Sequence, residues 1–447
     1  MSKVIEHQNS NTLALDDYAI HAWYRFVLSF PPHLVRKYLN LFELHKRSIV
    51  FDPFCGTGTT LVEAQKYGFK NIGADAHPFA AFVSQAKTKW SIPLYELDKI
   101  RSKIISRTDG EYQRHGLAAL TMRHLLLKEN SAAYYDDTIL SADELKLIPT
   151  GFLSPVPLKK LLLLRSSIRQ ICRNTPDDIK DFFYLALCHT IANGAGNFSF
   201  GPEIYRTKPK EDYDVLGHFA EQTHIMIHDM RTINEASTLY EEAEVFCNDS
   251  RNCTFLQDRR IDAVITSPPY PNEKDYTRTT RVESVLLGMI KGKDELRGVK
   301  NWLLRSNTRN VFVGDNDSDE IREFKNIDEV CRKIENRRIE LGKTSGFERL
   351  YHKVVAHYFG GMRKHLRTLR PHLSPHAKLA YVVGDQLSFL MVPVYTAKLL
   401  GEIAVAEGYK IIGIDLWRER VGTKVRNSKT GEKIVRVREE VLIMEKR

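Results

Sequence analysis

The stretch SIVFDPFCGTGTTLVEAQKYGFKNIGADAHP, Ser48–Pro78, decides the fold that we expect. It begins with a short apolar run that ends on Asp52, which is typical of a buried strand. Residues 59–68 then have the apolar spacing of an amphipathic helix, and residues 70–75 form a second strand-like run that ends on Asp75. A strand, a helix and a strand in this order predict two parallel strands joined by a crossover helix.

The same alternation resumes in the C-terminal half of the chain. The expected strands there are residues 243–249, 261–265, 378–385, 410–417 and 439–446, and the expected helices are residues 351–371 and 392–409. We therefore expect an α/β fold with a doubly wound, mostly parallel sheet. Only a loop separates the last two strands, so the last strand is expected to be antiparallel.

Two segments do not fit this sheet. Residues 91–242 contain several helix-like runs, which predict a mostly helical insertion. Residues 277–345 are polar and rich in charge, which predicts a second insertion. The α/β domain would then comprise residues 1–90 and 243–447.

The composition is that of a globular protein with a basic excess. The net charge of +10 favours a polyanionic partner such as nucleic acid, although it does not require one. The six cysteines form no C-x-x-C pair, so we expect neither a disulfide framework nor a zinc site, nor any other metal site. No apolar run is long enough for a signal peptide or a membrane span, so we expect a soluble, cytoplasmic protein with no membrane partner.

Residues 52–60, DPFCGTGTT, connect the first strand to its helix. Glycines at positions 56 and 58 let the backbone turn tightly and approach a ligand, and the helix N-terminus behind them presents free N–H groups. A tight turn without a ligand is the alternative. The loop follows the carboxyl end of a strand, where ligands bind in open α/β sheets, and it lacks the third glycine of dinucleotide loops and the lysine of P-loops. These features favour a nucleotide-like ligand without a pyrophosphate.

Two acidic residues follow neighbouring strands. Asp75 is placed to accept hydrogen bonds from ribose hydroxyls, or else it is a loop residue or a helix cap. Asp249 ends the next strand, where it could receive the exocyclic amine of an adenine or form a turn.

The tetrapeptide Ser267-Pro268-Pro269-Tyr270 follows the apolar run at residues 261–265. One interpretation of this tetrapeptide is a surface turn with no role in function. The alternative is a site that acts on the exocyclic amine of a nucleobase. Such an amine is a poor nucleophile, because its lone pair is delocalised into the ring. The Ser267 hydroxyl and the Pro268 carbonyl could accept its two protons, while the prolines offer no competing N–H. Tyr270 offers a flat face for a base taken out of the duplex.

Together, Phe54-x-Gly56-x-Gly58 and the tetrapeptide resemble the S-adenosylmethionine-dependent DNA methyltransferases that modify exocyclic amines. The runs DPFCGTGTT and TSPPYPNEKDYTR look particularly like the cytosine-N4 and adenine-N6 enzymes of bacterial restriction–modification systems, and the resemblance covers roughly residues 20–90 and 243–445. It implies a Rossmann-like class I methyltransferase fold, S-adenosyl-L-methionine as cofactor and double-stranded DNA as substrate. It also implies base flipping and a cognate restriction endonuclease that acts separately.

The resemblance also implies roles for individual residues. The loop from Phe54 to Gly58 would hold the methionine part of the cofactor, Asp75 the ribose, and Asp249 would lie near the adenine. An upstream segment, FPPHL, resembles one that helps to enclose the cofactor. The residues expected to bind the cofactor are Pro31, Asp52, Phe54, Cys55, Gly56, Thr57, Gly58, Thr59, Thr60, Asp75 and Asp249, and the expected catalytic residues are Ser267, Pro268, Pro269 and Tyr270.

Ser267 favours cytosine as the target base. Serine at this position is typical of the members that methylate cytosine N4, whereas members that methylate adenine N6 usually have Asp or Asn. Adenine N6 remains an alternative, as does guanine N2 of RNA, because related RNA enzymes carry similar motifs. A non-catalytic DNA-binding protein with the same fold is an alternative of another class.

Three stretches are candidates for contact with DNA, or else are structural loops and solvated charge: residues 193–206, 297–310 and 417–438. The last is expected to form a basic hairpin between the final two strands. Asp275 and Tyr276 would line the target pocket or hold its loop. The basic residues expected to bind DNA are Arg278, Arg281, Arg305, Arg309, Lys424 and Arg426.

Overall fold

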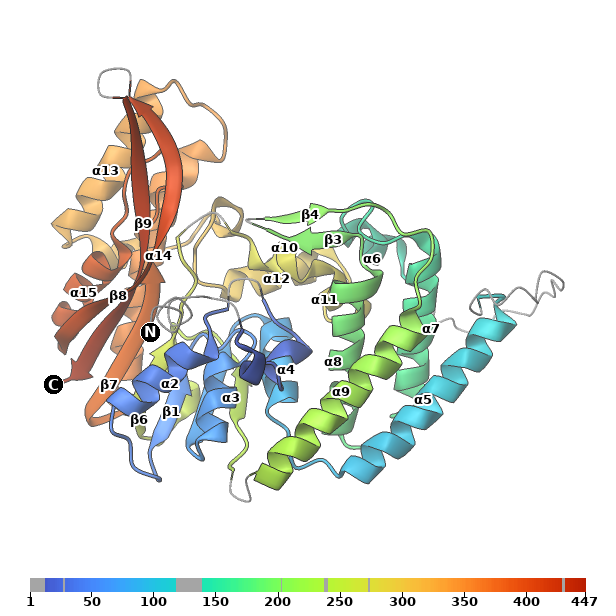
Figure 1. Cartoon of the computed structure of the whole chain (residues 1–447). Helices are drawn as coiled ribbons and strands as arrows, with labels where there is room; N and C mark the ends of the chain where they lie inside the picture. Colours follow the sequence, from blue (N-terminus) through green and yellow to red (C-terminus); the bar gives the residue numbers. More distant parts are fainter. Residues whose placement is uncertain are drawn as a thin grey trace.

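A computed structural model of the chain describes residues 13–26, 29–117, 139–201, 203–236, 240–271, 274–427 and 431–447. Its centre is a sheet of seven strands in the order β5-β2-β1-β6-β7-β9-β8 (Figure 1). The strands are β1 (Ile49–Asp52), β2 (Lys70–Asp75), β5 (Glu244–Cys247), β6 (Ile261–Thr266), β7 (Leu373–Gly384), β8 (Tyr409–Asn427) and β9 (Gly431–Lys446).

The direction of the strands confirms the predicted fold class. The pairs β1–β2, β2–β5, β1–β6 and β6–β7 are parallel, whereas β9 is antiparallel to both β7 and β8. The sheet is therefore mostly parallel with an antiparallel last strand, as the predicted Rossmann-like fold requires.

Helices cover both faces of this sheet because its strands are apolar on both sides. In β1, Val50 packs with α2 (Pro32–Leu41), whereas the next residue, Phe51, packs in the core that contains α14 (Tyr351–Leu369). Helix α3 (Thr59–Lys66) crosses from β1 to β2, and α15 (Thr396–Ala406) precedes β8. The carboxyl ends of β1, β2 and β6 consequently meet at one edge of the sheet.

A second core lies beside the sheet and is built mainly from helices (Figure 1). Helices α5 (Leu94–Arg114), α7 (Pro155–Ile171), α8 (Asp177–Thr190) and α9 (Val215–Ala236) pack there, as the helix-like runs of residues 91–242 predict. Helix α4 (Pro78–Lys87) and the short α11 (Arg281–Leu286) join them. The remaining α-helices of the described chain are α6 (Ala142–Leu147), α10 (Tyr276–Thr279), α12 (Lys293–Trp302) and α13 (Lys325–Glu340).

Two β elements differ from the expectation. Residues 193–206 contain an antiparallel pair, β3 (Phe198–Phe200) and β4 (Ile204–Arg206), rather than only a loop. The hairpin expected between the last two strands is a continuation of them, since β8 and β9 pair from Tyr409–Lys446 out to Asn427–Gly431.

None of the helices in the described ranges combines the length and the apolar character that a membrane span requires.

Candidate active site

The glycine loop, residues 53–58, joins β1 to α3 in a backbone conformation that requires glycine. Gly56 and Gly58 have φ angles of 52° and 83°, which L side chains rarely adopt. The Gly58 N–H donates to the Cys55 carbonyl over 2.7 Å, which closes the turn before α3. A Cβ atom on Gly58 would lie 3.2 Å from the Cα of Ser84. The loop thus lies tightly against α4 and could not take a side chain at Gly58 without moving that helix.

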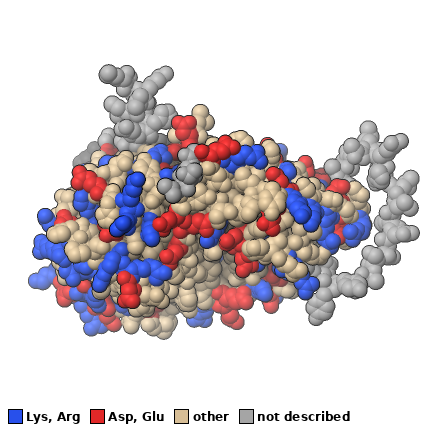
Figure 2. All heavy atoms as spheres, turned by 90° about the horizontal axis from the view of Figure 1, so that it is seen from below, with Lys and Arg blue, Asp and Glu red and all other residues tan. Residues whose placement is uncertain are grey.

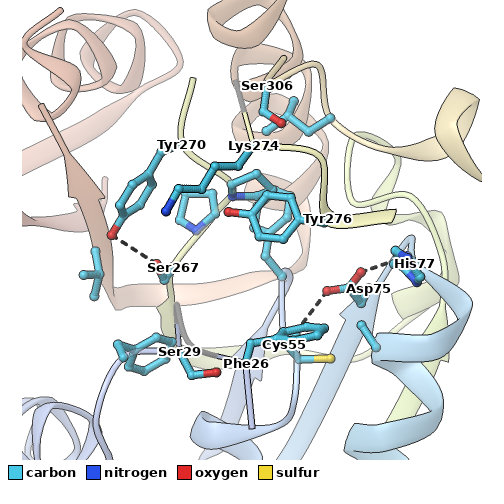
Figure 3. Close-up of a pocket in the computed structure, with 18 of the residues that line it drawn as sticks. Phe26, Ser29, Cys55, Asp75, His77, Ser267, Tyr270, Lys274, Tyr276 and Ser306 are labelled. Carbon is cyan, nitrogen blue, oxygen red and sulfur yellow. Dashed lines mark hydrogen bonds between the residues drawn. The ribbon is translucent and has the colours of Figure 1, made fainter. Parts of the chain in front are cut away.

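Asp75 at the end of β2 is held beside this loop. Its carboxylate accepts a 3.0 Å hydrogen bond from the Gly56 N–H and a 2.8 Å bond from the His77 N–H (Figure 3). Burial raises the pKa of Asp75 to about 6, although the two backbone donors act in the opposite direction. The carboxylate is therefore mostly ionised at neutral pH and is fixed relative to the glycine loop.

The tetrapeptide begins where β6 ends. Ser267 Oγ lies 3.4 Å from Tyr270 Oη, to which it can donate a long hydrogen bond (Figure 3). The Tyr270 ring lies against Gly384 at the end of β7, where a Cβ atom would approach the ring to 3.0 Å. Strand β7 and its terminal glycine therefore support the tyrosine from one side.

The glycine loop and the tetrapeptide line the same cavity. It has about 1320 Å³ of empty space when its mouth is included. The residues expected from the sequence that line it are Phe54, Cys55, Gly56, Thr57, Thr59, Asp75, Ser267, Pro268, Pro269 and Tyr270. The parallel order of β2, β1 and β6 causes this convergence, since it places the three strand ends next to each other.

Comparison with known proteins agrees with this arrangement. A family model described as DNA methylase, that of the N6 and N4 methyltransferases, matches residues 4–86. Type II methyltransferase M.BsoBI of Geobacillus stearothermophilus is 26% identical over 284 residues, which cover 62% of this chain and 54% of the relative. Type II methyltransferase M.MvaI of Kocuria varians is 24% identical over 338 residues, which cover 69% of this chain and 65% of the relative. The predicted resemblance to DNA amino-methyltransferases of the restriction–modification type is confirmed.

The family resemblance has two further aspects. The chain spans only about half to two thirds of the length of these two relatives, 54% and 65%. A tRNA (guanine(10)-N2)-dimethyltransferase of Methanocaldococcus jannaschii is 50% identical over 44 residues, which cover 10% of this chain and 12% of that protein. This short match concerns a small part of the chain, whereas the matches to the two type II methyltransferases cover most of it.

Five residues expected at the cofactor site do not line the cavity: Pro31, Asp52, Gly58, Thr60 and Asp249. Pro31 is the N-cap of α2, and its neighbours Ser29 and Phe30 line the cavity instead. Ser29 Oγ lies 3.2 Å from Thr57 Oγ1, so this upstream segment contacts the glycine loop. Thr60 is buried and donates to the Ile265 carbonyl over 3.0 Å, which ties α3 to β6.

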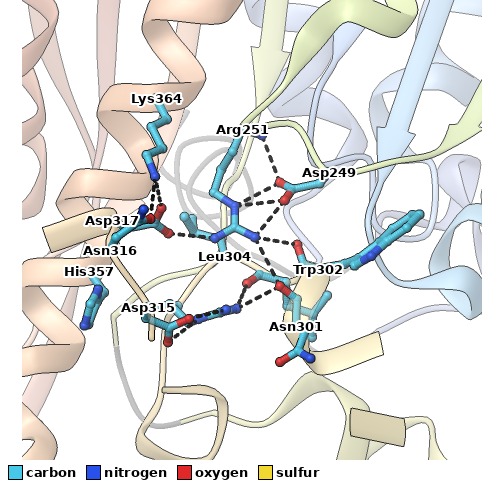
Figure 4. Close-up of polar contacts among 12 residues, drawn as sticks. Asp249, Arg251, Asn301, Trp302, Leu304, Asp315, Asn316, Asp317, His357 and Lys364 are labelled. Carbon is cyan, nitrogen blue, oxygen red and sulfur yellow. Dashed lines mark hydrogen bonds and ion pairs between the residues drawn. The ribbon is translucent and has the colours of Figure 1, made fainter. Parts of the chain in front are cut away.

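Asp249 differs most from the expectation. Its carboxylate accepts hydrogen bonds from Arg251 Nε at 2.9 Å and Nη2 at 2.7 Å, and it lies outside the cavity wall (Figure 4). Arg251 also pairs with Asp317 at 2.6 Å and donates to the carbonyls of Asn301 and Trp302. Asp249 therefore orients Arg251 and does not line the cavity, and its expected role near the adenine stays a prediction.

Arg305 is also not where the prediction requires it. It is 4% exposed, its Nε and Nη2 donate to Asp315, and its Nη1 donates to the Leu303 carbonyl over 2.6 Å. A buried guanidinium with these partners stabilises the turn at residues 303–315, and its expected contact with DNA stays a prediction.

The other basic residues expected to bind DNA have different environments. Arg278 is partly exposed and lies 3.7 Å from Glu203 in the turn between β3 and β4. Arg281 donates to the carbonyl and hydroxyl of Thr277, and burial lowers the pKa of its guanidinium. Arg309 is exposed, over the ring of Phe347 at 5.7 Å. The side chains of Lys424 and Arg426 lie outside the described residues.

The basic excess does not gather on the face of the molecule seen from below. Figure 2 shows Lys and Arg interspersed there with Asp and Glu. The net charge of +10 therefore does not by itself identify a surface for DNA.

Several residues of the cavity wall were not expected to act at the site. They are Phe26, Ser29, His77, Ala80, Lys274, Leu303, Leu304, Ser306, Asn307, Asn310, Val382, Trp417, Arg418 and Glu439, and they come from segments far apart in the sequence. Among them, Asn307 Nδ2 donates to the Lys274 carbonyl over 2.9 Å, which joins the second insertion to the loop after the tetrapeptide. Tyr276, which was expected to line the target pocket or hold its loop, lines the cavity, and burial beside Asp75 raises its pKa to about 12.

Asp275 holds the loop after the tetrapeptide. It caps α10, accepts a 2.6 Å hydrogen bond from Thr277 Oγ1 and pairs with Lys300 at 2.8 Å. Among the described residues, no group of His, Cys, Asp and Glu side chains is arranged to hold a metal ion.

Proposed function

We propose that this protein is a site-specific DNA methyltransferase that transfers a methyl group from S-adenosyl-L-methionine to the N4 of cytosine in duplex DNA after base flipping. The observation that carries the proposal is that Ser267 and Tyr270 line one cavity with the glycine loop and Asp75. The same cavity thereby offers a site for a nucleoside cofactor and acceptors for a base amine, so a methyl group could pass directly from one to the other.

The wall of the cavity fits the cofactor chemically. Gly56 has a positive φ. A Cβ atom built on it would have the Phe54 carbonyl oxygen, 4.0 Å away, as its nearest neighbour, so there is space beside the backbone at Gly56. Asp75 offers acceptors for ribose hydroxyls, and the rings of Phe26 and Phe54 offer apolar contact. When bound, the cofactor supplies an electrophilic methyl group on a sulfonium. We assign its methionine part to Phe54–Thr57 and its ribose to Asp75.

The tetrapeptide would orient and activate the target amine. The Ser267 hydroxyl and the Pro268 carbonyl are the acceptors that we assign to the two amine protons. Holding these protons makes the nitrogen more sp³-like and directs its lone pair away from the ring. The Tyr270 ring, supported by Gly384, would stack on the extruded base. Positioning and electrostatics then provide most of the rate enhancement.

The choice of cytosine rests on Ser267 in place of the Asp or Asn that is usual in adenine-N6 enzymes. A carboxylate or amide at this position would reach further into the cavity than a hydroxymethyl group. We further propose that the protein is the modification half of a restriction–modification system. DNA methylated by it should then resist cleavage by an endonuclease that reads the same site.

One experiment tests the proposal directly. The protein is incubated with S-adenosylmethionine labelled in its methyl group and with mixed-sequence duplex DNA or, separately, with total RNA, and the labelled nucleoside is identified after digestion. N4-methyldeoxycytidine is expected. Label in N6-methyldeoxyadenosine would instead assign adenine, label only in RNA guanosine would assign the RNA alternative, and DNA binding without any label would favour a non-catalytic protein.

A further inference from the structure

One wall of the cavity is formed by the strands on the far side of the tetrapeptide. Val382 of β7, Glu439 of β9 and Arg418 of β8 line this wall. Glu439 is the sheet partner of Gly384 on one side and of Arg418 on the other, and Gly384 supports the Tyr270 ring. The Arg418–Glu439 pair therefore lies on the strands next to the proposed stacking face for the base.

A bulge in β8 turns Arg418 toward the cavity. Consecutive residues of a regular strand point to opposite faces of a sheet, yet Trp417 and Arg418 both line the cavity. The register between β8 and β9 shifts between Leu416 and Arg418, and this leaves Trp417 as the extra residue. Bulges often redirect side chains next to active sites, and this bulge brings a guanidinium to the cavity that regular pairing would direct away.

Glu439 holds the guanidinium by one of its edges. Arg418 Nε and Nη2 donate to the two carboxylate oxygens, the second bond being 3.1 Å long. The Glu439 side chain is only 7% exposed, whereas that of Arg418 is 24% exposed. A guanidinium has five N–H groups, so this side-on pairing leaves two parallel N–H groups at its end, on Nη1 and Nη2, for a further pair of acceptors.

We propose that Arg418, oriented by Glu439, reads the ring edge of the target base and donates to N3 and O2 of a flipped cytosine. This inference rests on the function proposed above and adds a residue that determines the choice of base. Cytosine carries the acceptors N3 and O2 in succession beside its amine, which matches the two parallel donors. Adenine carries N1 followed by a C–H group at the corresponding positions, so one donor would be left unpaired.

The experiment measures how strongly the protein prefers a target cytosine over an analogue that lacks the N3 acceptor. Sequencing of a methylated plasmid first identifies the target site, and duplexes are then made with cytosine or 3-deazacytosine, which lacks the N3 acceptor, at that position. The ratio of kcat/KM for the two duplexes is measured for the unmodified protein, for Arg418→Met and for a matched control, Arg438→Met. Arg438 belongs to the neighbouring cross-strand pair with Glu419 at 3.7 Å, and it does not line the cavity.

The ratio of kcat/KM for the cytosine duplex to that for the 3-deazacytosine duplex is expected to be about 10- to 100-fold higher in the unmodified protein and in Arg438→Met than in Arg418→Met. This is the discrimination that a good paired contact to a base provides. Any difference in intrinsic reactivity between the two bases is the same for all three proteins, so it cancels. Affinity for S-adenosylmethionine, measured by calorimetry, is expected to be unchanged in Arg418→Met. A residue with only a structural role would lower the rate on both duplexes equally.

An unchanged preference in Arg418→Met would overturn the inference and leave cytosine methylation standing. No methylation of cytosine by the unmodified protein would overturn the proposed function, and the inference with it. If Arg418→Met does not fold, Arg418→Lys serves the same purpose, because it keeps the positive charge but not the parallel donors. A lysine variant that retains the full preference would likewise overturn the proposal.

Discussion

Thr266 donates a 2.6 Å hydrogen bond to Asp52, and this contact joins the residue before the glycine loop to the residue before the tetrapeptide. Both side chains are fully buried, and the second Asp52 oxygen has no hydrogen-bond partner among the described residues. Burial raises the pKa of Asp52 to about 7, and the hydrogen bond from Thr266 opposes this shift. Asp52 was expected to bind the cofactor; here it fixes the spacing of the two motifs from behind.

Replacement of Thr266 by valine should destabilise the protein. The variant keeps the shape of the side chain but removes one of the two donors to a buried carboxyl group and leaves only the Phe54 N–H, which costs about 1–3 kcal/mol in the free energy of unfolding. Urea unfolding measures this loss. Thr232→Val is the control, since Thr232 is exposed on α9 and bonds only within its own helix. Equal losses for the two variants would contradict the structural role of the Asp52–Thr266 contact.

Affinity for S-adenosylmethionine should depend on the ionisation of Asp75. The pKa of this group is raised to about 6, so lowering the pH through that value protonates the carboxylate and removes an acceptor for the ribose. Binding should therefore weaken as the pH falls and reach a plateau above the pKa, as measured by calorimetry.

Two variants separate this effect from general titration. Asp75→Asn should bind weakly at every pH, without the transition near the pKa of Asp75. Asp181→Asn should keep the transition, because Asp181 also has a pKa raised by burial to about 6 but lies on α8, outside the cavity wall. If the transition disappeared in Asp181→Asn, Asp181 and not Asp75 would be the group that controls cofactor binding.

Gly56→Val should abolish cofactor binding. Its φ of 52° is strained for a β-branched residue by about 1–2 kcal/mol, and the added side chain would project from the loop that lines the cavity. Gly342→Val is the matched control, because Gly342 has a φ of 60° at the end of α13 and open space around it. Both variants should lose stability, but only Gly56→Val should lose binding of S-adenosylmethionine in calorimetry.

Tyr270→Ala should reduce methyl transfer far more than cofactor binding. Loss of a stacking face for the base lowers kcat/KM for DNA by about 10- to 100-fold, the range for base–aromatic stacking. Incorporation of labelled methyl groups and calorimetry with the cofactor give the two quantities. Tyr395→Ala, at a tyrosine that is 54% exposed and outside the cavity wall, should leave both unchanged. Full activity in Tyr270→Ala would show that the ring does not hold the base.

Arg251→Ala should destabilise the protein and loosen one wall of the cavity. Arg251 joins Asp249 after β5 to Asp317 and to the carbonyls of Asn301 and Trp302, just before Leu303 and Leu304 of the wall. The expected cost is about 3 kcal/mol, the lower end for breaking a buried ion pair, since Lys364 remains beside Asp317.

Urea unfolding and the KM for DNA test this expectation. Arg322→Ala is the control, because its ion pair with Asp319 is exposed and should contribute less than about 1 kcal/mol. A loss of stability in Arg251→Ala as small as that of Arg322→Ala would contradict the proposed connection.

Local sequence patterns predicted the elements that form the edge of the sheet. The apolar run before Asp52, the helix that ends at Gly68 and the strand that ends at Asp75 are confirmed as β1, α3 and β2. These elements follow from residues close together in the chain, namely apolar periodicity and a glycine in the left-handed conformation after a helix. The predicted antiparallel last strand followed equally from the short connection between β8 and β9.

The sequence was less informative wherever the outcome depends on contacts between distant segments. Arg418 and Glu439 line the cavity because β9 lies between β7 and β8 and because of the bulge at Trp417, and no local pattern reveals either feature. Arg305 resembles an exposed basic residue until its pairing with Asp315 is known. Asp249 did carry a signal, since an arginine two residues further on is a natural partner within the same turn.

The most direct test of the account is a crystal structure of the protein with S-adenosylhomocysteine. We expect the ribose hydroxyls within hydrogen-bond distance of Asp75, the homocysteine part along Phe54–Thr57, and the sulfur facing Ser267. A ligand bound elsewhere, or one whose sulfur points away from the tetrapeptide, would contradict the claim that this cavity brings a methyl donor and a base amine together.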